Sequence, residues 1–196
     1  MIDCSSCKKC SCYQGMKCAK GYDFTKYKEL SVNEYKNQEN EKILKVATKI
    51  EAEHYMKWTR LEEIICFSKD MDYKKIGIAM CIGLIEEANT LLKILTKNFA
   101  VTTICCKSCG FEKKKYELPN VRPDRLEVTC NPIAQAQILN DEKTDLNIIV
   151  GLCVGHDILF TKYSKAPVIT FIAKDRVLGH NTAASIYSSY YKRKLL

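Results

Sequence analysis

The chain has 196 residues, 46% of them hydrophobic, which is enough for one domain with a real core and a small appendage. Lysine and arginine exceed aspartate and glutamate by 31 − 23 = +8, but they are spread along the chain, which favours solvated faces over a nucleic-acid stripe. No apolar run reaches transmembrane length and nothing at the start resembles a signal peptide, so we expect a cytoplasmic protein without a membrane partner.

Twelve cysteines are the strongest signal in the composition. In a cytoplasmic chain, so many thiols favour metal binding over disulfides. Two four-thiolate centres, each carrying about −2, would lower the net charge to about +4.

Residues 1–20 form a cysteine-rich segment with almost no apolar side chains. Its thiols are those of Cys4, Cys7, Cys10, Cys12 and Cys18. Because such a segment cannot fold by burying apolar surface, we expect a metal ion or cluster to hold it together. Cys-x-x-Cys spacing suits zinc and iron–sulfur clusters alike, and the short, polar character of the segment favours zinc slightly.

Residues 21–70 are expected to be a helical part that packs on the core. The polar and aromatic residues of 21–38 predict one or two short helices, and apolar residues at three- and four-residue spacing predict a helix over 39–69. Cys66 falls in this helix and is interpreted as a core residue.

Residues 71–196 show alternating strand and helix patterns. We predict strands at 75–81, 99–105, 146–152 and 167–173, and helices at 84–97, 132–140, 156–163 and 182–191. Asn131 and Pro132 suit the N-cap and first position of the helix that follows them. The pattern predicts an α/β fold with a small, doubly wound, mostly parallel, Rossmann-like sheet of order 2-1-3-4.

Four cysteines follow the predicted strands or precede a helix. Ligands of parallel sheets bind beyond the carboxyl ends of the strands, and thiolates at helix starts gain from backbone N–H groups. We therefore predict one site, an iron–sulfur cluster or a zinc ion, at these residues: Cys81, Cys106, Cys130 and Cys153. The alternative is that each is a small buried hydrophobic residue.

Three further residues are candidate catalytic groups at the same edge. His156 begins the third predicted helix after a tight turn expected at Gly155, and its imidazole would be drawn toward the protonated form by a negative cluster and could donate a proton. Asp157 would orient it or cap the helix, and His180 lies in the loop after the last strand. Structural roles are equally open for each.

Several of these motifs together resemble one family. They are Cys4-x2-Cys7-x4-Cys12-Tyr13, Ile82-Gly83-Leu84-Ile85-Glu86-Glu87, Cys130-Asn131-Pro132, the stretch from Gly151 to Asp157, and the stretch from Lys174 to Asn181. The family is an uncharacterised metal-binding family of archaea and anaerobic bacteria, a domain of unknown function with a cysteine-rich N-terminus. The resemblance implies metal at two sets of four, Cys4, Cys7, Cys12 and Cys18, and Cys81, Cys106, Cys130 and Cys153, and implies no particular activity.

Three functions remain open at this point. The first is an iron–sulfur redox protein or oxidoreductase of anaerobic metabolism, with an electron-transfer partner or a small-molecule substrate. The second is a zinc-binding structural or regulatory interaction module, and the third is a metal or sulfur carrier. No GxGxxG, Walker A loop or serine nucleophile elbow is present, and nucleic-acid binding is the least favoured function.

Overall fold

The computed structural model describes residues 1–196 and divides into two compact units, residues 1–55 and 56–196. The finer division at residues 20 and 70 stays a prediction. No helix is both long and apolar enough to span a membrane.

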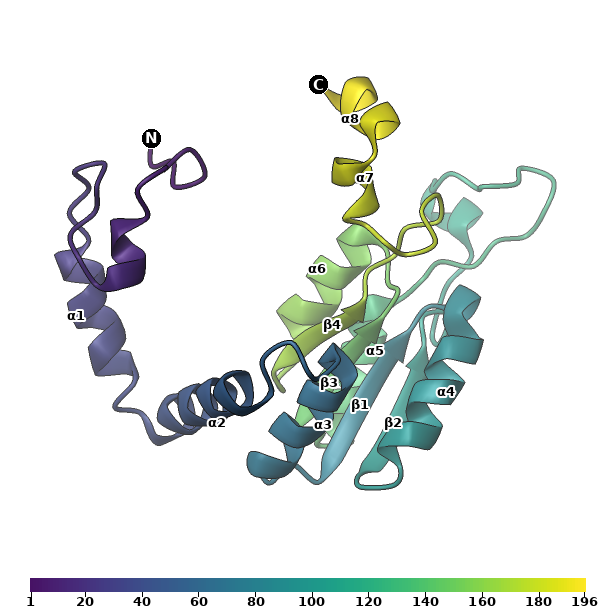
Figure 1. Ribbon diagram of the computed structural model, residues 1–196. Helices are drawn as coiled ribbons and strands as arrows, with labels where there is room; N and C mark the ends of the chain where they lie inside the picture. Colours follow the sequence, from purple (N-terminus) through teal and green to yellow (C-terminus); the bar gives the residue numbers. More distant parts are fainter. The chain divides into compact units, whose positions relative to one another are not determined.

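The first unit contains the cysteine-rich segment and two helices (Figure 1). No residue of 1–20 is buried, and the only regular element there is the short 3-10 helix η1 (Ser11–Gln14). Helix α1 (Thr25–Glu34) has no buried residue either. Helix α2 (Gln38–His54) starts at an N-cap asparagine, Asn37, and buries Val46 and Ile50. The cysteine-rich segment of residues 1–20 thus lacks an apolar core of its own, as its composition predicts.

The prediction of one continuous helix over 39–69 is wrong, because the structure has two helices in this stretch. The chain leaves the helix after His54, and Met56 adopts the left-handed conformation with φ 56°. Helix α3 (Arg60–Asp70) then begins with a capping box in which the Thr59 hydroxyl accepts the Glu62 N–H and the Glu62 carboxylate accepts the Thr59 N–H. The periodicity continued across the break because both helices are amphipathic, and the Thr-x-x-Glu signature marked the new start.

The second unit is built on a four-stranded parallel sheet of order β2-β1-β3-β4, which confirms the predicted topology. Its strands are β1 (Lys75–Met80), β2 (Ala100–Cys105), β3 (Leu146–Val150) and β4 (Val168–Ile172). Every residue of β3 is buried, as expected of a central strand covered on both faces. The chain winds outward from the neighbouring strands β1 and β3 in opposite directions, so the switch point lies between them.

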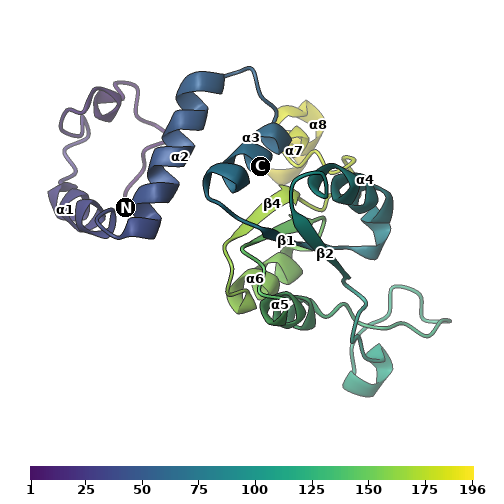
Figure 2. The same cartoon turned by 90° about the horizontal axis from the view of Figure 1, so that it is seen from below.

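Helices cover both faces of this sheet (Figure 2). Helix α3 and α4 (Ile85–Leu95) lie on one face, and α5 (Pro132–Asp141) and α6 (Val154–Tyr163) pack side by side on the other. Two short 3-10 helices, η2 (Ile82–Leu84) and η3 (Lys113–Tyr116), follow β1 and β2. The predicted helix over 182–191 is two pieces, α7 (Ala184–Tyr187) and α8 (Ser189–Leu195), because Ser188 is extended with ψ 122°.

The core contains two close approaches that fix individual residues. A Cβ atom on Gly77 of β1 would lie 2.1 Å from Asn147 Oδ1 and 2.8 Å from Leu139 Cδ1, so only glycine lets β3 and α5 approach at this point. Asn147 itself is fully buried, but it is satisfied by Thr144 and Ser164.

Candidate thiol site at the carboxyl edge of the sheet

Three of the predicted cysteines follow three neighbouring strands at one edge. Cys81 comes directly after β1 and Cys106 directly after β2, and the Cys106 N–H donates to Met80 O at 2.8 Å. The Cys81 N–H donates to Val150 O at 3.0 Å, which ties it to the end of β3, and Cys153 follows three residues later as the N-cap of α6. The parallel register therefore brings all three residues to the carboxyl edge.

Cys130 returns to this edge because the long loop after β2 folds back on itself. The Asn131 N–H donates to Cys106 O at 2.8 Å, and the Asn131 side-chain amide donates to Cys109 O at 2.9 Å. Asn131 also caps α5 through the Ala134 N–H, as predicted. These bonds leave the sulfur atoms of Cys106 and Cys130 3.6 Å apart.

The thiols of Cys81, Cys106 and Cys130 form a row of contacts with Cys106 in the middle. Cys106 is buried, and its contacts with the sulfurs of Cys130 and Cys81, together with that burial, raise its pKa. The hydrogen bond from Cys106, aided by the Gly83 N–H and by Lys174, lowers the pKa of Cys81 to about 5. The same Cys106 contact, aided by Lys107 and His156, lowers the pKa of Cys130 to about 6. The three thiols therefore titrate as one coupled group.

Three cations lie near these sulfurs, and we call Lys107, Lys174 and Arg176 the cation rim. Arg176 Nη2 donates to Cys153 Sγ at 3.3 Å, and its charge also acts on Cys81 and Cys130. The guanidinium thereby links the fourth thiol, that of Cys153, to two of the other three. Lys107 anchors its amine on Val128 O beside Cys130. We refer to the four cysteines together as the thiol site.

Lys174 crosses the switch point between β1 and β3. Its Cε lies 3.5 Å from where a Cβ on Gly151 would stand, and its Nζ lies 3.7 Å from the corresponding position on Gly83. Gly151 adopts φ +66°, and a Cβ there would meet Leu84 Cδ1 at 1.8 Å. The tight turn after β3 is therefore made by Gly151, whereas Gly155, where the sequence predicted it, lies inside the first turn of α6.

His156 and Asp157 occupy the first turn of α6 beside the thiol site. His156 is half-buried, and its charge acts on both Cys130 and Asp157. Burial raises the pKa of Asp157 to about 6, against the opposing effect of His156. Asp157 Oδ1 is buried without a hydrogen-bond partner, so this oxygen neither orients His156 nor caps the helix.

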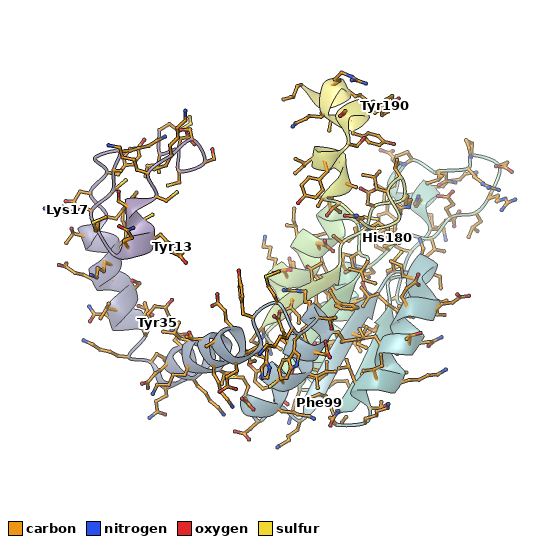
Figure 3. All side chains as sticks on the ribbon, viewed as in Figure 1. Tyr13, Lys17, Tyr35, Phe99, His180 and Tyr190 are labelled. Atoms are coloured by element: carbon orange, nitrogen blue, oxygen red, sulfur yellow. The ribbon has the colours of Figure 1, made fainter.

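His180 serves the loop after β4 and lines a separate cavity. Its Nδ1 accepts the Asp175 N–H at 3.0 Å, which assigns the remaining ring proton of the neutral imidazole to Nε2. The residue has φ 66°, and Figure 3 shows it in the loop that leads to α7. Together with Glu87, Thr170 and Phe171 it lines a cavity of about 470 Å³.

The N-terminal cysteines lie in a series of turns. The Cys7 N–H donates to Cys4 O at 3.1 Å, and the Gly21 N–H donates to Cys18 O at 3.0 Å. The backbone N–H groups of Cys10 and Lys9 donate to the Cys7 sulfur and lower its pKa. A thiol that accepts hydrogen bonds from backbone N–H groups within a turn ionises more readily.

No three His, Cys, Asp or Glu side chains have the close arrangement of a preformed metal-ion site.

The residues that sequence reasoning missed are Lys107 and the amide of Gln135, and Lys174 and Arg176 were noted only as part of a motif. A lysine or arginine does not by itself indicate a binding site in a sequence. Lys174 and Arg176 reach the thiol site only because the loop after β4 passes the ends of β1 and β3 in the folded chain. Gln135 is completely buried on α5 and donates to Met80 O at 3.2 Å and Ile104 O at 2.8 Å, just before Cys81 and Cys106.

Comparison with known proteins gives two findings. Residues 19–171 match the family described as protein of unknown function (DUF1847). The uncharacterized protein MJ0455 of Methanocaldococcus jannaschii is 58% identical over 195 residues, which cover 100% of this chain and 98% of that protein. No solved structure matches the chain.

Proposed function

The chain belongs to the DUF1847 family, and because that description assigns no activity, we propose from the thiol site itself that the protein binds a redox-active iron–sulfur centre there. The observation that supports this proposal is that four cysteines from separate elements lie at one sheet edge, with donors directed at their sulfurs. When bound, such a centre supplies one-electron transfer, and the chain's own residues set its charge, orientation and exposure.

The chemistry of the four residues suits an anionic metal centre. Metals bind thiolates, and two of the thiols already favour the ionised form, with pKa values of about 5 at Cys81 and about 6 at Cys130. The Ile82 N–H donates to Cys106 Sγ at 3.4 Å and Arg176 donates to Cys153 Sγ at 3.3 Å. Hydrogen bonds of this kind to ligand sulfurs are one of the ways in which proteins tune cluster potential.

The position of the site favours a functional centre over a structural one. The sheet unit already buries a continuous apolar cluster that includes Ile78, Ile148 and Phe160, so it does not need metal in order to fold. The segment 1–20 has no such core, and we propose that zinc or a second cluster at Cys4, Cys7, Cys12 and Cys18 folds it.

His156 is the proposed proton donor of the sheet-edge site. It comes from the first turn of α6 and its charge acts on Cys130, so it lies close enough to influence a group held there. Electrons would come from a one-electron donor protein and the proton from the imidazole. His180 is the weaker candidate, because its Nδ1 is engaged by the Asp175 N–H.

Zinc at the sheet edge is a second candidate, favoured by one distance. Tetrahedral zinc with bonds of about 2.3 Å separates its sulfurs by about 3.8 Å. The Cys106–Cys130 separation of 3.6 Å is close to that value. Under this alternative the centre is colourless and the protein is an interaction or carrier module.

Metal stoichiometry of two matched variants tests the assignment of ligands. Cys130→Ser should lose the sheet-edge centre and retain the N-terminal one. Cys109→Ser should retain both, because Cys109 is exposed and its sulfur makes none of the contacts described above. Both variants and the unmodified chain are purified without oxygen, and iron, sulfide and zinc are counted per chain. Full metal content in Cys130→Ser would refute the site.

A further inference from the structure

Two members of the cation rim come to the end of the sheet where an open α/β fold receives its ligand. Lys174 passes over the chain between the ends of β1 and β3, which is the switch point of this sheet. Arg176 follows two residues later and reaches Cys153. Both side chains come from the one loop after β4, so the fold delivers two cations to the place where a substrate of the thiol site would bind.

The rim brings positive charge to the thiol site. Its three side chains contribute three positive charges, and a loaded four-thiolate centre carries about −2. The Asp175 carboxylate, which lies between two of these cations in the chain, accepts the N–H groups of Val177 and Leu178 within its own loop. The charges of Lys174 and Arg176 act instead on the sulfurs of Cys81 and Cys153, where a ligand of the site would bind.

Arg176 has unused donors for an anion. Its Nη2 contacts Cys153, but the residue is exposed, and a guanidinium offers five N–H groups in a planar fork. That fork matches the paired oxygens of a carboxylate or a phosphate-like group.

We propose that the ligand of the thiol site is a small oxyanion, held by Arg176 with the Lys174 amine beside it. This inference rests on the proposed function in placing a substrate at these sulfurs, and it adds the chemical class of that substrate. A carboxylate and a tetrahedral oxyanion share the recognising chemistry.

Alkylation of the metal-free full chain tests the inference without relying on any metal. Iodoacetate and iodoacetamide both lose iodide to a thiolate as the S–C bond forms, but only iodoacetate brings a carboxylate. The iodoacetate-to-iodoacetamide rate ratio at Cys153, read by mass spectrometry, therefore reports anion recruitment independently of the nucleophilicity of the thiol.

The ratio at Cys153 should exceed that at the exposed Cys109 of the same molecules. Arg176→Gln should lower the Cys153 ratio on the order of fivefold, which is the attraction between unit charges a few ångströms apart in water. Arg176→Lys should retain most of the ratio because it keeps the charge. The control Arg193→Gln, which removes a charge from α8, should change nothing.

Added anions separate the two ligand classes. Inorganic phosphate and acetate should each slow iodoacetate at Cys153, and the one that acts at the lower concentration identifies a tetrahedral or a carboxylate ligand. Equal slowing by chloride at matched ionic strength would mean screening alone and would overturn the proposal.

An unchanged ratio in a folded Arg176→Gln chain would also overturn it. If that variant does not fold by circular dichroism, Lys174→Gln with the ratio read at Cys81 replaces it under the same criterion. Metal content of the same variants, measured separately, reports on the proposed function, so failure of one idea is distinguishable from failure of the other.

Discussion

Replacing Gln135 by methionine should loosen the support of the thiol site. The Gln135 amide donates to Met80 O at 3.2 Å and to Ile104 O at 2.8 Å, and the side chain is completely buried. Methionine is close in shape and donates nothing. Two lost hydrogen bonds are worth about 2 kcal/mol, and removing the unpartnered Gln135 Oε1 returns part of that, about 1 kcal/mol. Because Met80 O keeps the Cys106 N–H, we expect a net loss of about 1 kcal/mol in the free energy of unfolding.

Denaturant unfolding followed by circular dichroism measures this loss. The matched control is Gln137→Met, which makes the same chemical change at an exposed position two residues along the same helix. The two amides differ only in what they contact. If Gln135→Met and Gln137→Met unfold at the same denaturant concentration, the amide does not tie α5 to the ends of β1 and β2, and the reasoning fails.

Three further predictions concern separate parts of the chain. Cys7→Ser should remove one metal site and leave the sheet unit folded, because that unit has its own core; full metal content would contradict it. Glu127, with a pKa of about 2 held low by Lys113 and the N–H groups of Val121 and Arg122, should stabilise its loop above about pH 4.5 and lose this effect as the pH falls toward about 2. The amide proton shifts of Val121 and Arg122 should titrate in that window, and they should not do so in Glu127→Gln. His156→Gln should raise the pKa of Cys130, read from the pH dependence of its reaction rate with iodoacetamide. An unchanged pH–rate profile would mean that the imidazole does not face that thiol.

The sheet and its order could be predicted because they depend on strong local patterns. The runs that became β1 and β3 are almost wholly apolar, and Asn131 and Pro132 mark the start of α5. Parallel strands then force Cys81 and Cys106 to one edge, since each follows its strand directly. The breaks after His54 and at Ser188 were harder, because a short non-helical stretch, residues 55–59 in the first case and the extended Ser188 in the second, interrupts a helix without disturbing the apolar periodicity.

The surroundings of the thiol site could not be predicted in the same way. Cys130 reaches Cys106 through bonds made by Asn131 across a long loop, and spacing alone does not specify such a path. Lys174 and Arg176 lie near the cysteines because the end of β4 is close to the ends of β1 and β3 in the folded sheet. Charged residues that come together only in the tertiary structure produce no periodic pattern in the sequence, so periodicity cannot reveal them.

The visible spectrum of the full chain, purified and kept without oxygen, tests the central claim most directly. A sheet-edge iron–sulfur centre predicts a brown protein with broad absorption near about 400 nm, the region of thiolate-to-iron charge transfer, and with iron and sulfide in equal amounts. The absorption should disappear in Cys130→Ser and persist in Cys109→Ser. A colourless protein that contains zinc and no iron, or colour that survives in Cys130→Ser, would contradict the account.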